Sequence, residues 1–310
     1  MRRANAAVTL GLFLIAACSG VRSQPTTQPA ADDGTAGGRS VTSQPTTRPV
    51  ADSPCPPATT QPASAAVAAA ASSGNAEVDT LLDRLEQKGA AITGLSSRIT
   101  YRFVTVEPVE DVQTKIGTLL FARAEPNPRF LIHFNRLIAG GIESERGEYF
   151  LFDGQWLTER NDKARTVTRR EIVRRGERVD PFRIGKGPFP LPFGQKREEI
   201  LQNFSVSLKD FEPGDPRNTR HLHCVPRPNT ELASKYRRVE LYIDRDVELP
   251  VRIVTERLSD GNRIEVDFAD IDTKEAPALS RFQVATPPEF TYTEEPLPVL
   301  ETPTPPSAKP

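Results

Sequence analysis

Short apolar runs separated by turn residues constrain the fold of this chain more than any other feature. Between Ser97 and Thr158 each run is rich in aromatic and β-branched residues, and Pro, Gly, Asn or Asp separates it from the next run. This pattern is typical of consecutive antiparallel strands that form a meander. The four runs are 99–103, 116–121, 130–134 and 149–152. Some of them are apolar on both faces, so the predicted sheet needs a cover on each face.

Further runs of the same kind continue through the second half of the chain. Asp153-Gly154 and Ser259-Asp260-Gly261-Asn262 are turn sequences that commonly join antiparallel strands. The further predicted strands are 155–160, 166–173, 204–208, 221–225, 239–244, 250–258 and 263–271. The sequence therefore predicts a mainly β fold with a few helices, an α+β arrangement.

Two segments have helical spacing instead. Residues 76–89 repeat apolar side chains at i, i+3, i+4 and i+7, which predicts an amphipathic helix with Asn75 as its N-cap. The apolar positions are Val78, Leu81, Leu82 and Leu85. Residues 195–203 predict a second, shorter helix.

The N-terminus has the pattern of a targeting signal. A basic Arg2-Arg3 pair precedes an apolar stretch over Ala6–Ala17 that is too short to span a bilayer. The stretch leads into Cys18 through a sequence that resembles a bacterial lipobox, so we predict a lipoprotein signal peptide over 1–17 and lipidation of Cys18. An ordinary signal peptide or an uncleaved anchor is the alternative. Ser19 in place of Asp favours the outer membrane.

Low-complexity sequence follows the cysteine and returns at the C-terminus. Residues 23–32 recur nearly unchanged as 43–52, and neither copy has an apolar face to bury. Such sequence buries too little apolar surface to offset the conformational entropy that it would lose on folding. We therefore predict a disordered tether over 18–75 and a disordered Pro-rich tail over 296–310. The folded domain is expected over 76–295.

A segment rich in both Pro and Phe interrupts the strands. Its prolines exclude a regular helix or a central strand over 181–193, yet it is too apolar for a free loop. We predict that it lies over an apolar surface as a lid. Its contact residues would be Phe182, Phe189, Leu191 and Phe193.

Arginines cluster just before this segment. Six of them lie between Arg165 and Arg178. The favoured interpretation is a solvated strand face whose arginine stems cover apolar surface. A basic patch for an anionic head group is the alternative.

The remaining chemistry in the sequence is sparse. His221 and His223 would share one face of a strand while Cys224 points to the other, which favours a plain strand over a metal site. No nucleophile or metalloprotease motif is present in the sequence, so we predict neither an enzyme, a metal nor a cofactor. A net charge of −1 gives no electrostatic case for binding nucleic acid.

The order of these features resembles the periplasmic lipoprotein carrier family, LolA, and its membrane-anchored relative LolB. The resemblance covers roughly residues 77–292. It rests on the amphipathic helix, on Gly117–Arg123 with Pro126–Phe130, on Phe152–Leu157, and on Leu249–Arg252 with Asp260–Arg263. It implies an incomplete antiparallel β-barrel with a helical and loop lid over a concave apolar face, which holds acyl chains in transit.

Site residues follow from this resemblance. Arg123 matches the arginine that hydrogen-bonds to the lid, although the proline that follows it in the family is Ala124 here. Phe130, Ile132 and Phe134 match positions that line the lipid cavity. We expect the neighbouring runs to contribute Tyr101, Phe103, Phe121, Phe150, Phe152 and Trp156.

Together these features predict a lipoprotein of the bacterial cell envelope that faces the periplasm and is anchored to the outer membrane. Its cavity would bind lipid or lipoprotein acyl chains during lipid transfer or sorting, and an envelope transport protein is a further expected partner. The alternative is an envelope sensor or scaffold with the same fold that binds a protein.

Overall fold

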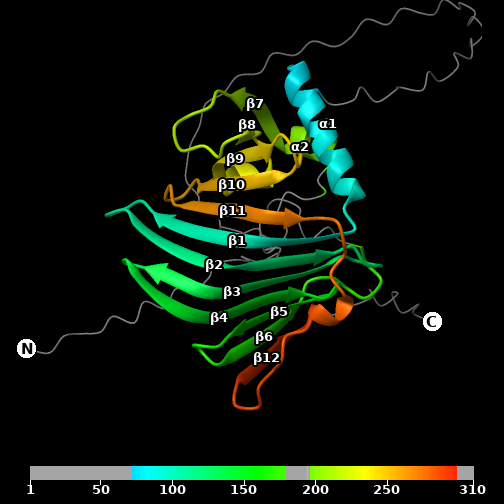
Figure 1. Ribbon diagram of the computed structural model, residues 1–310, viewed down its shortest axis with the longest axis vertical. Coiled ribbons are helices and arrows are strands. Elements are labelled where there is room, and N and C mark those ends of the chain that lie inside the picture. The colour runs from blue at the N-terminus through cyan, green and yellow to red at the C-terminus, as the bar shows by residue number, and fades with distance from the viewer. Residues whose placement is uncertain (1–71, 179–193, 195, 299–310) are drawn as a thin grey trace, which may run out of the picture. The chain divides into compact units, whose positions relative to one another are not determined.

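Two antiparallel meanders form one open sheet in this protein, and a single strand pairing joins them. The computed structural model describes residues 72–178, 194 and 196–298. Within that part of the chain the strand order is β12-β6-β5-β4-β3-β2-β1-β11-β10-β9-β8-β7 (Figure 1). The first six strands are β1 (Gly94–Thr105), β2 (Asp111–Ala122), β3 (Arg129–Ala139), β4 (Ile142–Phe152), β5 (Trp156–Asn161) and β6 (Thr166–Glu171).

The second meander follows a short helix. Its strands are β7 (Phe204–Lys209), β8 (Thr219–Pro226), β9 (Tyr236–Asp244), β10 (Pro250–Arg257) and β11 (Arg263–Asp272). The two meanders meet where β1 pairs antiparallel with β11, with Thr100 opposite Asp267. Because β12 and β7 stand at the two ends of the strand order, the sheet is not closed. The predicted mainly β class and incomplete barrel are thus confirmed.

Period-two alternation divides the sheet into two faces. The inner face carries the large apolar cluster, which includes Ile99, Leu119, Ile132, Leu241 and Val266. The outer face carries their neighbours in sequence and is more polar. Side chains of adjacent residues point to opposite faces of a strand, so the strands bury one half of their residues on the inner face.

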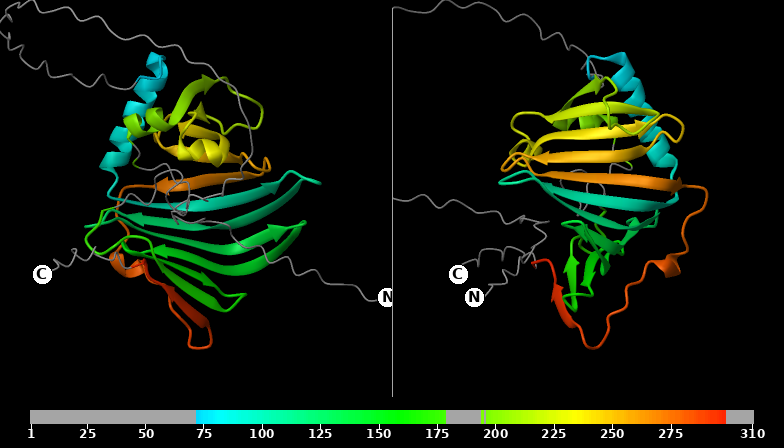
Figure 2. Two further views of the ribbon diagram at one scale, coloured as in Figure 1. Left: turned by 180° about the vertical axis from the view of Figure 1, so that it is seen from behind. Right: turned by 60° about the vertical axis from the view of Figure 1, so that its left-hand side comes forward.

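Two helices lie on the inner face. The first, α1 (Ala76–Ala91), has the predicted N-cap, because the Asn75 side chain accepts from the backbone N–H groups of Glu77 and Val78. Its buried residues are Val78, Leu82, Leu85 and Gly89. The second, α2 (Arg197–Asn203), buries Ile200 and Leu201. Both helices contact β7, and Figures 1 and 2 show α1 on the β7–β11 side of the sheet, away from β3–β6.

Gly117 lies at an irregularity in the pairing of β2 with β3, where the two backbones approach closely. The register shifts between Ile116 and Gly117, and a Cβ atom on Gly117 would lie 1.9 Å from the carbonyl oxygen of His133. Only glycine leaves room for this approach. The glycine that opens the Gly117–Arg123 motif is therefore required by the sheet itself.

The C-terminal part of the domain crosses the outer face. We call residues 279–298 the C-terminal strap; it begins with a 3₁₀ turn (η2, Leu279–Arg281) and includes β12 (Thr291–Glu295), as Figure 2 shows. A second 3₁₀ turn, η1, spans Glu231–Ser234. Phe282 of the strap is buried with Leu120, Ala122 and Leu151 in a small outer-face cluster.

β12 was not among the predicted strands. It pairs with β6 in parallel, from Thr291 opposite Thr166 to Glu295 opposite Arg170. An ion pair of 2.6 Å between Arg170 Nε and Glu295 Oε2 crosses this pairing. All five residues of β12 are exposed, so no apolar face marks it as a strand in the sequence.

Several predictions lie outside the described residues. These are the signal peptide over 1–17, lipidation of Cys18, nearly all of the tether, the lid residues Phe182, Phe189, Leu191 and Phe193, and most of the Pro-rich tail. Among the helices that are described, none is long and apolar enough to cross a membrane.

Candidate functional site: the inner face of β1–β5

Most of the predicted cavity residues lie together on the inner face. Tyr101, Phe121, Phe130, Ile132, Phe134, Phe150 and Phe152 are all buried in the large apolar cluster. The register explains this, because Phe121 lies opposite Phe130 and Phe130 opposite Phe152 on three adjacent strands. Neighbouring strands therefore place their aromatic side chains in a row across the sheet.

The rings of this row contact one another. The centroids of Phe130 and Phe152 are 5.7 Å apart, and Phe134 meets Tyr101 at 6.0 Å in an edge-to-face arrangement. Burial raises the pKa of the Tyr101 hydroxyl, so this group stays neutral. Phe103 is only partly buried and packs against the margin of the cluster.

Trp156 differs from the prediction. It lies on the outer face, where the guanidinium of Arg169 stacks 4.5 Å from its ring centroid, and Leu157 takes the inner position. Adjacent residues of a strand point to opposite faces, so only one of the two contributes to the inner cluster. In a run where both are apolar, the sequence alone does not show which one.

Arg123 connects this face to the end of α1. Its Nε donates to the carbonyl oxygen of Ile92 at 2.9 Å, and its Nη2 donates to that of Gly89 at 3.0 Å. The last carbonyl groups of a helix lack partners within the helix and favour a cation. The predicted lid-contact arginine thus holds the C-terminal end of the helix that covers part of the inner face.

One buried ion pair interrupts the apolar inner face. Lys115 lies opposite Tyr101, Glu148 lies opposite Phe134, and their Nζ and Oε2 atoms are 2.5 Å apart. Both side chains are nearly buried, at 12% and 11% exposure. Sequence reasoning missed this pair, since register shifts on β2, β3 and β4 obscure which residues face inward. It marks a polar boundary at one end of the aromatic row.

The His221-x-His223 pair lies on the outer face. The Glu240 carboxylate forms a hydrogen bond with each imidazole. Its Oε2 lies 3.0 Å from His221 Nε2, and its Oε1 lies 2.8 Å from His223 Nδ1. Cys224 points into the core, where burial raises the pKa of its thiol. Among the residues described by the structure, no group of three or more potential ligands is arranged to hold a metal ion.

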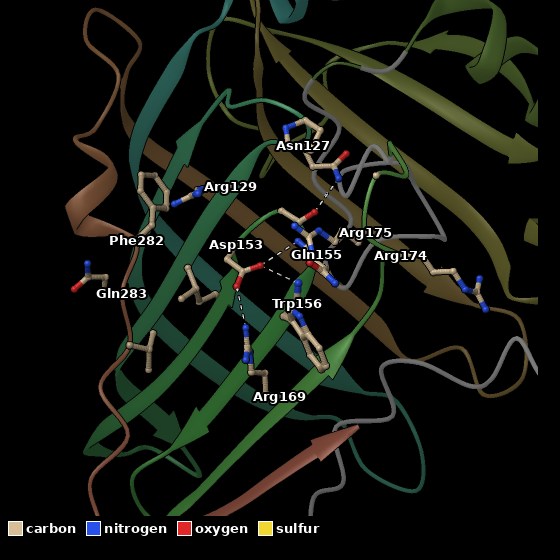
Figure 3. A pocket seen from close by; sticks show the side chains of 15 residues that line it. Asn127, Arg129, Asp153, Gln155, Trp156, Arg169, Arg174, Arg175, Phe282 and Gln283 are labelled. Carbon is tan, nitrogen blue, oxygen red and sulfur yellow. Dashed lines mark hydrogen bonds and ion pairs between the residues drawn. The ribbon is translucent and has the colours of Figure 1, made fainter. Parts of the chain in front are cut away.

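A pocket of about 930 Å³ opens on the outer face, as Figure 3 shows. It lies between the β2–β3 and β4–β5 hairpins, the loop after β6 and the C-terminal strap. Its lining includes Trp156 and four arginines: Arg129, Arg169, Arg174 and Arg175. It faces away from the predicted cavity.

Comparison with known proteins gives relatives in structure only. No family model matches the sequence, and no curated protein is significantly similar to it. An uncharacterized conserved protein from Thermus thermophilus matches at a TM-score of 0.43 and 10% identity, over 71% of this chain and 99% of that chain. A LolA superfamily protein from Nitrosomonas europaea matches at a TM-score of 0.31 and 14% identity, over 66% and 97%.

The MucA/MucB complex from Pseudomonas aeruginosa also matches part of this chain. The TM-score is 0.36 at 14% identity, over 68% of this chain and 62% of that chain. The present chain therefore spans less than two thirds of that relative. At these identities the comparisons describe the type of fold and carry no information on what this chain binds.

Proposed function

We propose that this protein is an envelope lipoprotein whose inner face binds acyl chains. One observation carries the proposal: the aromatic row of β1–β4 is a continuous apolar cluster buried on the same face as α1 and α2, while those helices lie on the β7–β11 side. The Phe-rich half of the face therefore needs a different cover. We propose that the cover is removable and that an acyl chain takes its place.

Simple energetics support a lipid ligand. Burying a methylene group contributes about 0.8 kcal/mol, so a few carbons on an apolar surface give useful affinity without any specific polar contact. Release requires a competing cover for the same surface. The Arg123 contact with the end of α1 would keep that helix in place while the cover moves.

The proposed location follows from the N-terminus. A lipidated Cys18 would anchor the chain to the bacterial envelope, and the outer membrane is the proposed site. The tether would let the domain reach acyl chains of lipids or lipoproteins at a distance from its own anchor. The proposed role is non-enzymatic, in lipid or lipoprotein transfer or sorting.

Acyl-chain binding is tested with the full chain carrying Cys18→Ser, so that its own lipid does not compete. A fluorescent fatty acid should bind with saturation to this protein. Phe150→Asn should weaken binding at least tenfold, because it places an amide in the apolar row. Leu151→Asn is the matched control: it is the next residue, it is equally exposed at 7%, and it lies on the outer face.

Thermal unfolding of both variants controls for lost stability. Failure of every fatty acid to bind the Cys18→Ser protein would contradict the proposal. An equal loss of binding in Phe150→Asn and Leu151→Asn would also contradict it, since the effect would then reflect stability and not the face.

A role as a sensor or scaffold is a second candidate, favoured by the edge of the sheet. β7 stands last in the strand order of the described sheet, so one side of it is available to a strand from a partner. The backbone N–H of Leu208 points away from β8, so Leu208→Pro should then abolish binding of that partner while the fluorescent fatty acid still binds. The reverse result would favour the acyl-chain role.

A further inference from the structure

The outer-face pocket has an excess of positive charge. Four arginines and a single carboxylate, Asp153, contribute to its lining, although the chain as a whole has a net charge of −1. Two of the arginines are neutralised by carboxylates. Arg169 pairs with Asp153 at 3.6 Å and with Glu294 at 3.5 Å, and Arg174 lies 4.0 Å from Glu177.

The other two arginines are not neutralised. Neither the Arg129 nor the Arg175 side chain makes a hydrogen bond or ion pair with another residue in the part of the chain described. Arg129 is half-buried at the start of β3, and Arg175 is exposed on the loop after β6. Two uncompensated positive charges therefore line one pocket from two different elements. That number matches a dianion better than a single carboxylate.

The wall between these arginines is held in place. Asn127 is 3% exposed, and its Nδ2 donates to the carbonyl oxygens of Gly154 at 2.8 Å and Glu177 at 2.9 Å. It thereby ties the β2–β3 hairpin to the β4–β5 turn and to the loop after β6. The Asp153 carboxylate accepts from the backbone N–H of Gln155 and Trp156, which fixes the turn (Figure 3). A binding site built in this way needs little ordering when a ligand enters.

The floor of the pocket is apolar. Leu151 and Phe282 belong to the small outer-face cluster, and Val284 packs against it; all three line the pocket. Trp156 also lines the pocket, and the guanidinium of Arg169 stacks on its ring. A ligand that fits both parts carries an anion and a short apolar group.

We propose that this pocket binds a phosphate monoester, with the phosphate between Arg129 and Arg175 and the organic group on Leu151, Phe282 and Val284. Guanidinium groups hold phosphate oxygens through paired hydrogen bonds, and a phosphate monoester carries close to two negative charges at neutral pH. The pocket lies on the opposite face of the sheet from the proposed acyl-chain surface. This inference therefore does not depend on the proposed function.

Hexyl phosphate is the probe for the full chain carrying Cys18→Ser. Calorimetry should show saturable binding that weakens with added salt. Inorganic phosphate should bind more weakly because it lacks the apolar group, and hexanoate should bind more weakly because it carries one charge. Phosphatidylcholine vesicles with and without phosphatidic acid form the second arm, which distinguishes a lipid head group from a soluble phosphate ester.

Arg129→Gln should weaken binding of hexyl phosphate about tenfold or more, and Arg175→Gln should do the same. Arg136→Gln is the matched control: it removes the same charge from the same strand, but it lies outside the lining and pairs with Glu143 on the surface. Because Arg175 is exposed, Arg175→Gln should fold normally. If Arg129→Gln is unstable, the result for Arg175→Gln decides the test.

If hexyl phosphate binds and both lining variants lose this binding, the proposal is supported and the ligand is a soluble phosphate ester. If only vesicles with phosphatidic acid bind and the same variants lose this binding, the proposal is supported and the ligand is a lipid head group. Absence of binding in both arms would overturn the proposal. Equal weakening by Arg136→Gln would overturn it as well, since the effect would then be one of overall charge, and so would equal affinity for hexanoate.

Discussion

His133 is the residue of the outer face whose charge is most clearly linked to folding. Its imidazole stacks on Tyr149, with ring centroids 4.1 Å apart and an interplanar angle of 6°. Burial lowers the pKa of His133; the Asp162 carboxylate opposes this shift and Arg160 adds to it. The folded protein therefore favours the neutral imidazole more than the unfolded chain does.

This shift predicts a pH-dependent stability. The pKa of His133 in the folded state is lower than its unfolded value of about 6.5. Below that unfolded value, the unfolded chain binds more protons than the folded one, so stability decreases as the pH falls from about 7.5 to about 5. His133→Gln should reduce this decrease, as measured by urea unfolding at both pH values. An unchanged difference between the two pH values would contradict the assignment to His133.

At the scale of the element, α1 is stabilised by contacts at both of its ends. Asn75 caps its start, and Arg123 of the segment after β2 binds its last carbonyl groups. Arg197, at the start of α2, pairs with Asp79 of α1 at 3.3 Å. The hydrogen bonds that Asp79 accepts from Ser73 and Ser72 lower the pKa of its carboxyl, so it stays charged in this pair.

Arg123→Gln should loosen α1 and leave the sheet intact. The variant loses the two guanidinium hydrogen bonds to Gly89 and Ile92, which should lower the free energy of unfolding by roughly 1 to 2 kcal/mol. Amide hydrogen exchange should become faster in α1 and stay unchanged in β9. Arg136→Gln, which breaks only an exposed pair, should cost less than about 1 kcal/mol. Equal protection of α1 in both variants would contradict a role for Arg123 in holding the helix.

The strands and helices of this domain could be predicted because their apolar patterns are regular. Every predicted strand run lies within or largely overlaps one of β1–β11, and the spacing of Val78, Leu82 and Leu85 predicted α1 correctly. The sequence also placed His221 and His223 on the face opposite Cys224. In each case burial on one face of an element left a periodic signal.

The rest of the site left no such signal. β12 is exposed along its whole length and is held by hydrogen bonds and ion pairs, which have no period. Trp156 and Leu157 are both apolar, so the sequence does not show which of them faces inward. The burial of Lys115 with Glu148 depends on register shifts that only the folded sheet defines. The outer pocket joins residues from three loops and the strap, far apart in sequence.

At the scale of the whole molecule, the proposed anchor determines where the domain acts. Lipid chains on Cys18 would hold the protein at a membrane with an affinity that grows by about 0.8 kcal/mol per buried methylene group.

Cell fractionation tests the anchor. The wild-type chain, expressed in a bacterium, should remain with the outer membrane, and Cys18→Ser should move it to the soluble fraction. Ser19→Asp should shift the protein toward the inner membrane without releasing it. Retention of the Cys18→Ser protein in the membrane fraction would contradict lipidation as the anchor.

The pairing of β1 with β11 also imposes an order on biosynthesis. The ribosome completes β1 and its whole meander long before it adds Asp267, which lies opposite Thr100 in the finished sheet. Until then one edge of β1 stands open next to a sheet that is already rich in exposed phenylalanine, and such edges recruit other strands. Completing the sheet therefore requires that this edge of β1 stays free of other strands until β11, near the end of the domain, is available.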